Sequence, residues 1–175
     1  MLEGKNVNLR VAEKEDFSLA SQWINNLEYV GEFQFSPQMS RTDIEKSFGS
    51  MGPEAKSFFV EKKDGTEIGS IGHRPEGKAQ EIGFSMLPSE RGKGFCSEAA
   101  QIMVDYLFLS KDIVRIQAHA DTENVASQKV LEKIGFRKEG VVRKNSFVRG
   151  EWRDDYMYSI LREEWKEPKI LTRKG

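Results

Sequence analysis

The chain has 175 residues, of which 38% are hydrophobic and 31% are charged, and its net charge is −1. This length favours one domain with its own core, and the near-neutral charge argues against a protein that mainly holds nucleic acid. No apolar run approaches the roughly 18 residues of a membrane span, and residues 1–6 lack the apolar segment of a signal peptide. We therefore expect one globular domain in the cytoplasm, with neither nucleic acid nor membrane as a partner.

Residues that bind metals or form disulfides are scarce. Cys96 is the single cysteine, and His73 and His119 are the two histidines. One cysteine cannot form an intramolecular disulfide, which fits a reducing compartment. This set is also too small for a zinc site. A Mg²⁺ or Ca²⁺ site made of carboxylates alone stays open, although no calcium-loop pattern is present, and we expect no metal.

The first fifty residues predict a strand and two helices. Residues 7–10 alternate in polarity as a short strand does, and apolar side chains at helical spacing over 17–27 indicate the first helix. Residues 29–40 contain glycine and proline and predict a loop. A second helix is expected over 42–48.

Three short strands are expected next, over 57–61, 67–73 and 81–87. Asp64-Gly65 marks a tight hairpin turn between the first two, and residues 75–78 mark a second turn. Such short connections predict an antiparallel meander.

The clearest helical pattern covers residues 97–109, where apolar side chains recur at i, i+3 and i+4. A β-rich segment follows over 113–119, so the strand–helix–strand unit predicts one parallel pairing. Asn124 can cap a last helix that ends at Ile134, and Gly135 fits the left-handed position beyond it.

Residues 136–161 predict a long hairpin that turns near Arg149-Gly150, and the polar residues 168–175 are expected to fray. The whole order is strand, two helices, three antiparallel strands, helix, strand, helix and two strands. This order predicts a single α+β domain with a mixed sheet.

The segment between the third strand of the meander and the 97–109 helix reads Arg91-Gly92-Lys93-Gly94-Phe95-Cys96-Ser97-Glu98. A helix N-terminus offers unpaired N–H groups and a partial positive charge, which suit a phosphate. The two glycines let the backbone approach an anion closely, and the two cationic side chains add charge. The segment therefore predicts a diphosphate-binding loop.

Two other phosphate motifs do not fit. The Walker pattern G-x-x-x-x-G-K-[ST] is absent. The dinucleotide fingerprint G-x-G-x-x-G fails as well, because Gly92-Lys93-Gly94 is followed by Phe95, Cys96 and Ser97.

Residues 91–96 instead resemble the [Q/R]-x-x-G-x-[G/A] loop of the GNAT superfamily, the acetyl-CoA-dependent N-acetyltransferases. The segments "EIGF", "RGKG", "SEA", Asn124-x-x-Ser127 and "VLEKIGFRKEG" follow in order and resemble more narrowly the RimJ/RimL branch, the ribosomal-protein N-acetyltransferases. The resemblance covers about residues 7–165. One position departs from the pattern: the sixth loop residue, usually Gly or Ala, is Cys96, which is still small.

The resemblance implies a single-domain GNAT fold over residues 1–175, with a mixed, mostly antiparallel, twisted sheet of about seven strands and about four flanking helices. It implies acetyl-CoA as co-substrate, a primary amine as acceptor and no metal, and it allows a homodimer. The residues implied to bind acetyl-CoA are Phe84, Ser85, Met86, Arg91, Gly92, Lys93, Gly94, Phe95, Cys96, Ser97 and Asn124.

An amine must lose its proton before it attacks a thioester. At pH 7 this costs about 1 kcal/mol for a chain α-amine and about 4.6 kcal/mol for a lysine amine. Glu81 is the candidate base, because it shares a strand face with Gly83 and Ser85, whose small side chains leave space. It also matches a glutamate base of some superfamily members. A plain salt-bridged glutamate would show the same pattern.

The resemblance also bears on the leaving thiolate. Many superfamily members place a tyrosine acid seven residues after the position of Asn124, but this chain has Leu131 there. Ser127 matches a serine of the RimJ/RimL branch and could hydrogen-bond the sulfur. A backbone partner for that hydroxyl, and solvent as the proton source, stay open.

Trp23, Phe33 and His73 are candidate contacts of the acceptor, although each could equally be a packing residue. Together these features predict an N-acetyltransferase acting on a protein N-terminal α-amine. Two alternatives stay open: the same reaction on a small amine (a polyamine, amino sugar, antibiotic or amino acid), and a non-catalytic acyl-CoA-binding module.

Overall fold

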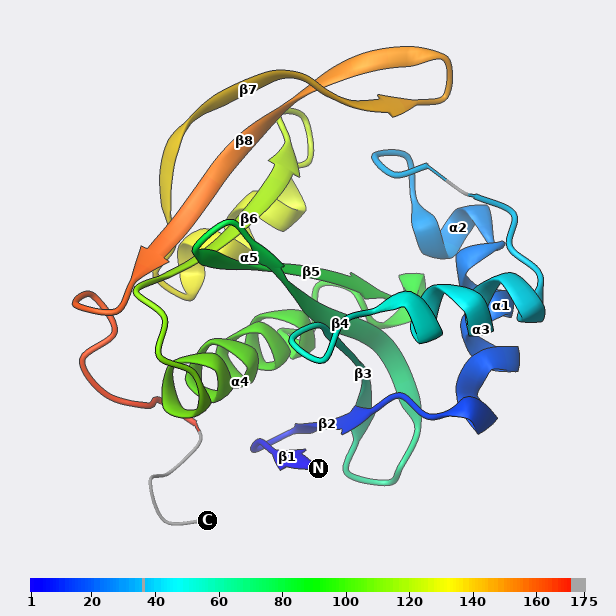
Figure 1. Cartoon of the computed structure of the whole chain (residues 1–175), viewed down its shortest axis with the longest axis horizontal. Helices are drawn as coiled ribbons and strands as arrows, with labels where there is room; N and C mark the ends of the chain where they lie inside the picture. The colour runs from blue at the N-terminus through cyan, green and yellow to red at the C-terminus, as the bar shows by residue number, and fades with distance from the viewer. Residues whose placement is uncertain (36, 171–175) are drawn as a thin grey trace.

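The computed structural model in Figure 1 describes residues 1–35 and 37–170. Over these residues one mixed sheet has eight strands in the order β1-β2-β3-β4-β5-β6-β8-β7. The strands are β1 (Leu2–Glu3), β2 (Val7–Val11), β3 (Lys56–Lys62), β4 (Glu67–Glu76), β5 (Ala79–Met86), β6 (Arg115–Asp121), β7 (Arg137–Val148) and β8 (Glu151–Leu161). All neighbours pair antiparallel except β5 and β6.

The α-helices of the described residues are α1 (Phe17–Ile24), α2 (Leu27–Val30), α3 (Arg41–Ser50), α4 (Phe95–Ser110) and α5 (Val125–Lys133). Short 3-10 turns precede α1 and α4. Local sequence explains where several of them begin. Ser40 accepts a hydrogen bond from the Asp43 amide at the start of α3, and Asn124 caps α5 in the same way.

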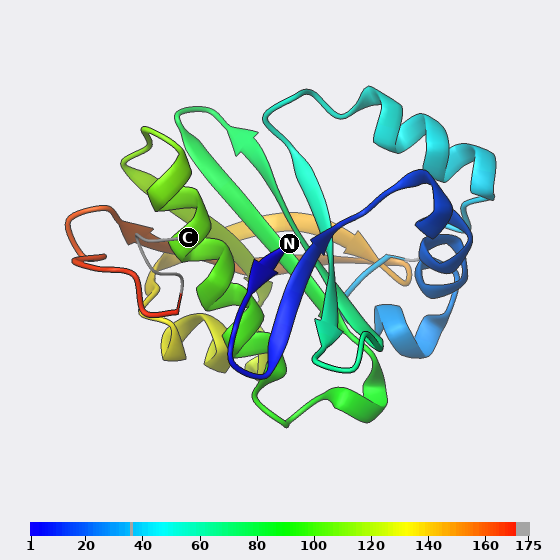
Figure 2. The same ribbon diagram turned by 90° about the horizontal axis from the view of Figure 1, so that it is seen from below.

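The core lies between α4 and one face of the sheet, and Figure 2 shows α4 lying across that face. Ile102, Met103 and Leu107 of α4 are fully buried, together with Val60 of β3 and Ile116 of β6. The apolar stripe of α4 and the apolar residues on one face of the sheet thus form a single core cluster. This core fixes α4 against the strands that carry the site.

The sheet opens between its two parallel strands. β5 and β6 pair only at Gln80–Ile116 and Glu81–Gln117, after which no further pairing joins them. β5 continues to Met86 and β6 to Asp121, so the two strands diverge over these residues. The divergence leaves one backbone edge of β5 without a strand partner, beside the loop that leads to α4.

The β7–β8 hairpin extends beyond this opening and curves toward α2 in Figure 1. It turns at Arg149 and Gly150, as the sequence predicts. The Arg149 guanidinium donates to the Gly31 carbonyl oxygen over 3.2 Å. The hairpin and the residues after α2 therefore lie on the same side of the opening.

The α+β fold, the meander, the parallel pair and the left-handed Gly135 (φ +100°) are all confirmed. The sheet has one strand more than expected, since residues 2–3 pair with β2. The predicted loop over 29–40 begins inside α2, because Asn26 caps that helix. None of the described helices is long and apolar enough to cross a membrane.

The expectation of a frayed tail over 168–175 is wrong for Lys169 and Ile170. Their amides donate to the Asp105 carboxylate of α4 over 3.0 and 2.7 Å. The sequence does not reveal this, because the acceptor lies more than sixty residues away. Residues 171–175 lie outside the described part of the chain.

Candidate active site

The predicted diphosphate loop has the backbone that anion binding requires. Gly92 and Gly94 have φ of +74° and +86°, a region that side chains with a Cβ rarely adopt. Gly94 is the N-cap of α4, so the amides of the helix's first turn have no carbonyl one turn earlier to bind. These N–H groups and the helix dipole form a site for a phosphate group.

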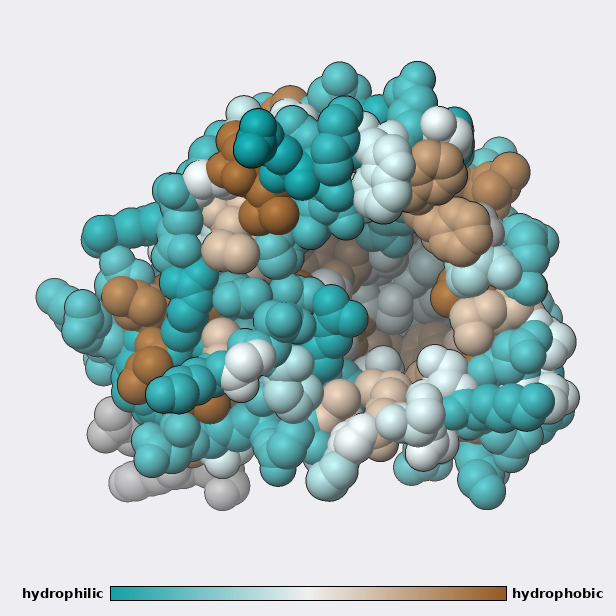
Figure 3. Space-filling view, turned by 45° about the horizontal axis from the view of Figure 1, so that its top comes forward, coloured by the Kyte–Doolittle hydropathy of each residue, from teal (hydrophilic) through white to brown (hydrophobic). Residues whose placement is uncertain are grey.

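A cavity of about 670 Å³ adjoins this loop, and Figure 3 shows the molecule deeply hollowed on that face. Four segments contribute its lining residues. They are α2 with the residues after it (within 29–34), the end of β5 (84–86), the loop into α4 with the start of that helix (within 90–97), and α5 with its N-cap (within 124–133). The volume lies within the range typical of small-molecule sites. The lining of the cavity includes the end of β5, which no longer pairs with β6.

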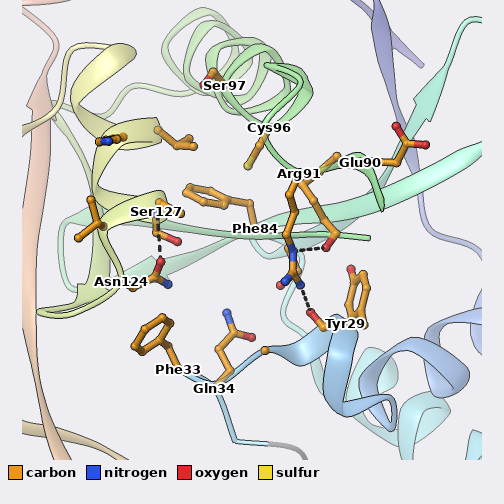
Figure 4. Close-up of a pocket in the computed structure, with 18 of the residues that line it drawn as sticks. Tyr29, Phe33, Gln34, Phe84, Glu90, Arg91, Cys96, Ser97, Asn124 and Ser127 are labelled. Atoms are coloured by element: carbon orange, nitrogen blue, oxygen red, sulfur yellow. Dashed lines mark hydrogen bonds between the residues drawn. The ribbon is translucent and has the colours of Figure 1, made fainter. Parts of the chain in front are cut away.

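Figure 4 shows that residues expected to bind the cofactor come together here. Nine of the eleven line the cavity: Phe84, Ser85, Met86, Arg91, Gly92, Gly94, Cys96, Ser97 and Asn124. Lys93 and Phe95 line a smaller pocket directly behind the loop. The grouping joins strand, loop and helix residues that are up to forty positions apart.

The edge of β5 offers backbone groups to the cavity. The Leu87 amide donates to the Ile68 carbonyl oxygen over 2.9 Å, toward β4. Because successive strand residues direct their backbone groups to opposite edges, the groups of Phe84 and Met86 point toward the opening. An extended ligand arm could hydrogen-bond there as an added strand would.

Arg91 is used differently from the expectation that its charge lies near the diphosphate. Its Nε donates to the Met86 carbonyl oxygen over 3.1 Å. Its Nη2 donates to the carbonyl oxygens of Glu28 and Tyr29 over 3.0 and 2.8 Å. The guanidinium therefore ties β5 to α2, while Lys93 pairs with Glu90 at 3.1 Å.

Asn124 and Ser127 lie on the opposite wall, at the start of α5. The Asn124 Oδ1 accepts from the Ser127 amide over 3.1 Å, so its amide nitrogen is left for another partner. Ser127 lines the cavity, and its hydroxyl makes no hydrogen bond within the described residues. Leu131 is fully buried in the core and cannot supply a proton.

Cys96 points its sulfur toward Phe84 in the cavity wall (Figure 4). Burial raises the pKa of its thiol to about 12. The thiol is therefore protonated at neutral pH, and a protonated thiol is a poor nucleophile. Cys96 serves as a small wall residue, in keeping with the sequence interpretation.

Glu81 stands where β5 and β6 begin to diverge. Its carboxylate accepts from Arg74 Nη2 (2.7 Å), His119 Nδ1 (3.1 Å) and Gln117 Nε2 (3.3 Å). Hydrogen bonds from His119 first, then from Arg74 and Gln117, outweigh desolvation and lower the pKa of Glu81 to about 2. A carboxylate held in this way is a weak base.

The three predicted acceptor contacts lie in different places. Phe33 lines the cavity, where the Arg153 guanidinium lies 5.5 Å from its ring centre. Trp23 stacks on Tyr29 and does not line the cavity. His73 is 3% exposed and bonds Gln80 on the core side of the sheet, so the structure does not bring it to the site.

Two further residues of this region make contacts that the sequence does not reveal. Tyr29, which the sequence offers as a candidate wall of an acceptor pocket, is 6% exposed and lines the cavity, and its hydroxyl lies 2.8 Å from the Ser70 hydroxyl. His119 contacts Glu81, although the sequence analysis gave it no role. No local pattern reveals either, because each contact crosses between segments that are far apart in the chain.

Comparison with known proteins identifies the family. The family model for the acetyltransferase (GNAT) domain matches residues 6–137. The chain belongs to the GNAT acetyltransferase family. It is an N-acetyltransferase, acetyl-CoA is its co-substrate, and the described residues contain no group of His, Cys, Asp and Glu that could hold a metal.

Three relatives illustrate the similarity. The uncharacterized N-acetyltransferase YnaD of Bacillus subtilis is 33% identical, covering 92% of this chain and 96% of the relative. The putative ribosomal N-acetyltransferase YdaF of Bacillus subtilis is 28% identical, covering 94% and 96%. The crystal structure of spermidine N-acetyltransferase from Vibrio cholerae with CoA and spermine has a TM-score of 0.83 at 22% identity, covering 93% and 99%.

Proposed function

We propose that this acetyltransferase transfers the acetyl group directly to a protein N-terminal α-amine, as RimJ/RimL-type enzymes do. The observation that carries the proposal is the cavity at the end of β5, whose lining contains the α4 loop and Ser85, on the sheet face that bears Glu81. A thioester bound along β5 would thus meet an acceptor that arrives on that face. No acyl-enzyme is needed, and Cys96 is not a nucleophile.

The cofactor contacts are proposed residue by residue. The amides of Phe95, Cys96 and Ser97 bind the diphosphate, since they open α4. The backbone of Phe84 and Met86 binds the pantetheine arm and the thioester oxygen, and Asn124 hydrogen-bonds the arm. Ser127 hydrogen-bonds the leaving sulfur, because its free hydroxyl faces the cavity.

The charges of the sheet face support an acceptor with a single amine. Three of its carboxylates are already paired with arginines: Glu81 with Arg74, Asp121 with Arg153, and Glu139 with Arg115. A fourth, Asp155, accepts a hydrogen bond from Asn145 Nδ2 over 2.7 Å. A polyamine carries several ammonium groups and gains most from unpaired carboxylates. An α-amine needs only one proton removed and costs less to neutralise at pH 7. The name of YdaF agrees with this substrate class.

A small cationic amine is the second candidate. Glu32 is exposed at the cavity wall and makes no ion pair among the described residues. It would attract an ammonium group near the mouth. The name of the Vibrio cholerae enzyme adds a polyamine to the acceptors worth testing.

One competition assay separates the candidates. Purified protein is mixed with acetyl-CoA and one acceptor at a time, and the reaction is followed by the release of free thiol. One panel of acceptors contains short peptides with free N-termini, and the other contains polyamines, amino sugars and amino acids. The proposal expects kcat/KM to be at least tenfold higher for some peptide than for any small amine. N-terminally blocked peptides with an internal lysine are the matched control and are expected to be poor acceptors. The reverse ranking would establish the second candidate.

The protein is also proposed to act in the cytoplasm. Its cysteine is free in the structure, which suits a reducing compartment. Fractionation of cells that produce the protein would test this.

A further inference from the structure

Glu81 and His119 meet across the point where the sheet opens. Glu81 lies in the last residue pair that joins β5 to β6, and its partner in that pair is Gln117. His119 is two residues further along β6, so it projects from the same face as Gln117. Its Nδ1 lies 3.1 Å from Oε2 of Glu81. The two side chains therefore bridge the start of the opening.

The contact determines which imidazole nitrogen is free. A carboxylate can only accept, so Nδ1 of His119 carries a proton and donates it to Glu81. In a neutral ring the lone pair is then on Nε2. Nε2 has no protein partner in the described residues, and the side chain of His119 is 21% exposed. A basic nitrogen is thus oriented and accessible.

The face of β5 between this pair and the cavity carries little side-chain bulk. Ser85 lines the cavity, and Gly83 and Glu81 follow on the same face of β5, at alternate positions. A Cβ at Gly83 would meet no atom within 4 Å. The strand surface at Gly83 is therefore open to a ligand that reaches from the cavity toward Glu81.

We propose that His119 is the proton acceptor of the transfer reaction and that Glu81 is the residue that positions it. The inference rests on the proposed amine acetylation. Nε2 takes one proton from the acceptor ammonium, and the neutral amine forms the new N–C bond while the C–S bond of the thioester breaks. The nitrogen then loses its second proton to solvent as the thiolate takes one proton from solvent, and His119 returns its own proton to solvent. The products are the amide and the free thiol.

Glu81 itself is poorly suited to accept that proton. A carboxyl with a pKa of about 2 takes a proton from an ammonium of pKa about 8 with an equilibrium constant of roughly 10⁻⁶. His119 is better matched, since its hydrogen bond to Glu81 raises the imidazole pKa above its usual value. Asp155 on β8 raises it further, while burial and Arg74 on β4 lower it.

The first test needs no substrate. NMR titration of the free protein follows the ring protons of His119 in the wild type and in Glu81→Gln. The inference expects the pKa of His119 to fall in the variant, because glutamine can still accept from Nδ1–H but carries no negative charge. An unchanged pKa would show that the Glu81 carboxylate does not hold the ring, and would overturn that part of the inference.

The second test compares His119→Gln with Glu81→Gln in acetyl transfer over pH 6 to 9. His119→Gln is expected to lower kcat about 10²-fold or more. It should also remove the acidic limb of the kcat–pH profile, where the rate of the wild type rises as the imidazole loses its proton. Glu81→Gln is expected to keep that limb at a lower pH, with a smaller loss. Added imidazole should restore part of the activity of His119→Ala.

Glu139→Gln is the matched control. Glu139 is also held by an arginine on this sheet face, which lowers its pKa to about 2, but it has no histidine partner. Its variant should keep wild-type kcat. If His119→Gln retains kcat within threefold, or if Glu81→Gln alone removes the limb, His119 is not the proton acceptor.

Two measurements on the wild type separate failure of the His119 assignment from failure of the proposed function: calorimetry with acetyl-CoA, and thiol release in the presence of an amine. A wild type that binds acetyl-CoA and acetylates an amine, with an active His119→Gln, overturns only the assignment to His119. A wild type that acetylates no amine overturns the proposed function, and the inference falls with it.

Discussion

The guanidinium of Arg91 donates from Nη2 to the carbonyl oxygen of Tyr29 over 2.8 Å. This bond connects the loop that leads into α4 with the end of α2, where Tyr29 and Val30 line the cavity. The same side chain also bonds the Met86 carbonyl oxygen at the end of β5. The first residue of the loop motif therefore braces the cavity wall, and under the proposed function the backbone amides of the loop bind the diphosphate.

We expect Arg91→Lys to weaken binding of the acceptor amine more than binding of acetyl-CoA. Lysine keeps the charge but cannot reach three carbonyl oxygens with a planar fork, and each lost bond costs about 1 kcal/mol. The KM for the acceptor should rise about tenfold, while the Kd for acetyl-CoA changes less than threefold. Arg143→Lys, at an exposed position of β7, is the control. If the KM for the acceptor and the Kd for acetyl-CoA rise by the same factor, the Arg91 side chain contributes to cofactor binding instead.

Gly94→Asp should abolish most acetyl-CoA binding. The variant places a negative charge at the N-cap of α4 and forces a residue with a Cβ to φ +86°. Gly94→Ala has the strain without the charge and should lose clearly less affinity. Gly77→Asp repeats the change at another left-handed glycine, in the β4–β5 turn, and should bind normally. Calorimetry measures all three, and unchanged affinity in Gly94→Asp would contradict the loop assignment.

Gly83→Val tests the path across the face of β5. Gly83 has open space around its Cα, so valine fits without a clash and fills the surface between Ser85 and Glu81. We expect kcat/KM for the acceptor to fall at least tenfold with little change in acetyl-CoA affinity. Gly83→Ala should have a smaller effect. A normal rate in Gly83→Val would mean that the acceptor reaches the thioester by another route.

Asp105→Asn should destabilise the fold without touching the site. Asp105 is fully buried in α4, and its carboxylate accepts from Trp165 Nε1 and from the amides of Lys169 and Ile170. Asparagine has one acceptor oxygen, so buried donors lose their partner at a cost of about 2 kcal/mol. Urea denaturation measures the change. Asp112→Asn, at an exposed position, should stay within about 0.5 kcal/mol of the wild type.

Glu81 should contribute to stability in a defined pH range. Its pKa is lowered from 4.5 to about 2 in the fold, so its partners stabilise the protein above pH 4.5 and this stabilisation is lost as the pH falls toward 2. Both histidines are protonated in the unfolded chain throughout this range. The stability difference between wild type and Glu81→Gln should therefore shrink between pH 5 and pH 3 in urea denaturation. A constant difference would mean that the carboxylate is not held in this way.

The sequence could predict what depends on neighbours along the chain. The order of strands and helices, the turns at Asp64-Gly65 and Arg149-Gly150, and the loop from Arg91 to Ser97 all follow from local periodicity, capping and glycine. The residues expected to bind the cofactor came from the family resemblance, and nine of them line the cavity. They belong mostly to one continuous strand–loop–helix segment.

The sequence alone thus determined an α+β fold and a loop suited to a diphosphate, because short-range backbone geometry specifies both, while the acetyltransferase family entered through the resemblance of its motifs. Only the tertiary structure decided that Arg91 braces α2, that Asp105 holds residues 169–170, and that Glu81 is paired with His119 and Arg74. Each of these contacts joins segments separated in sequence, and hydrogen bonds and pKa values depend on which groups the fold brings together.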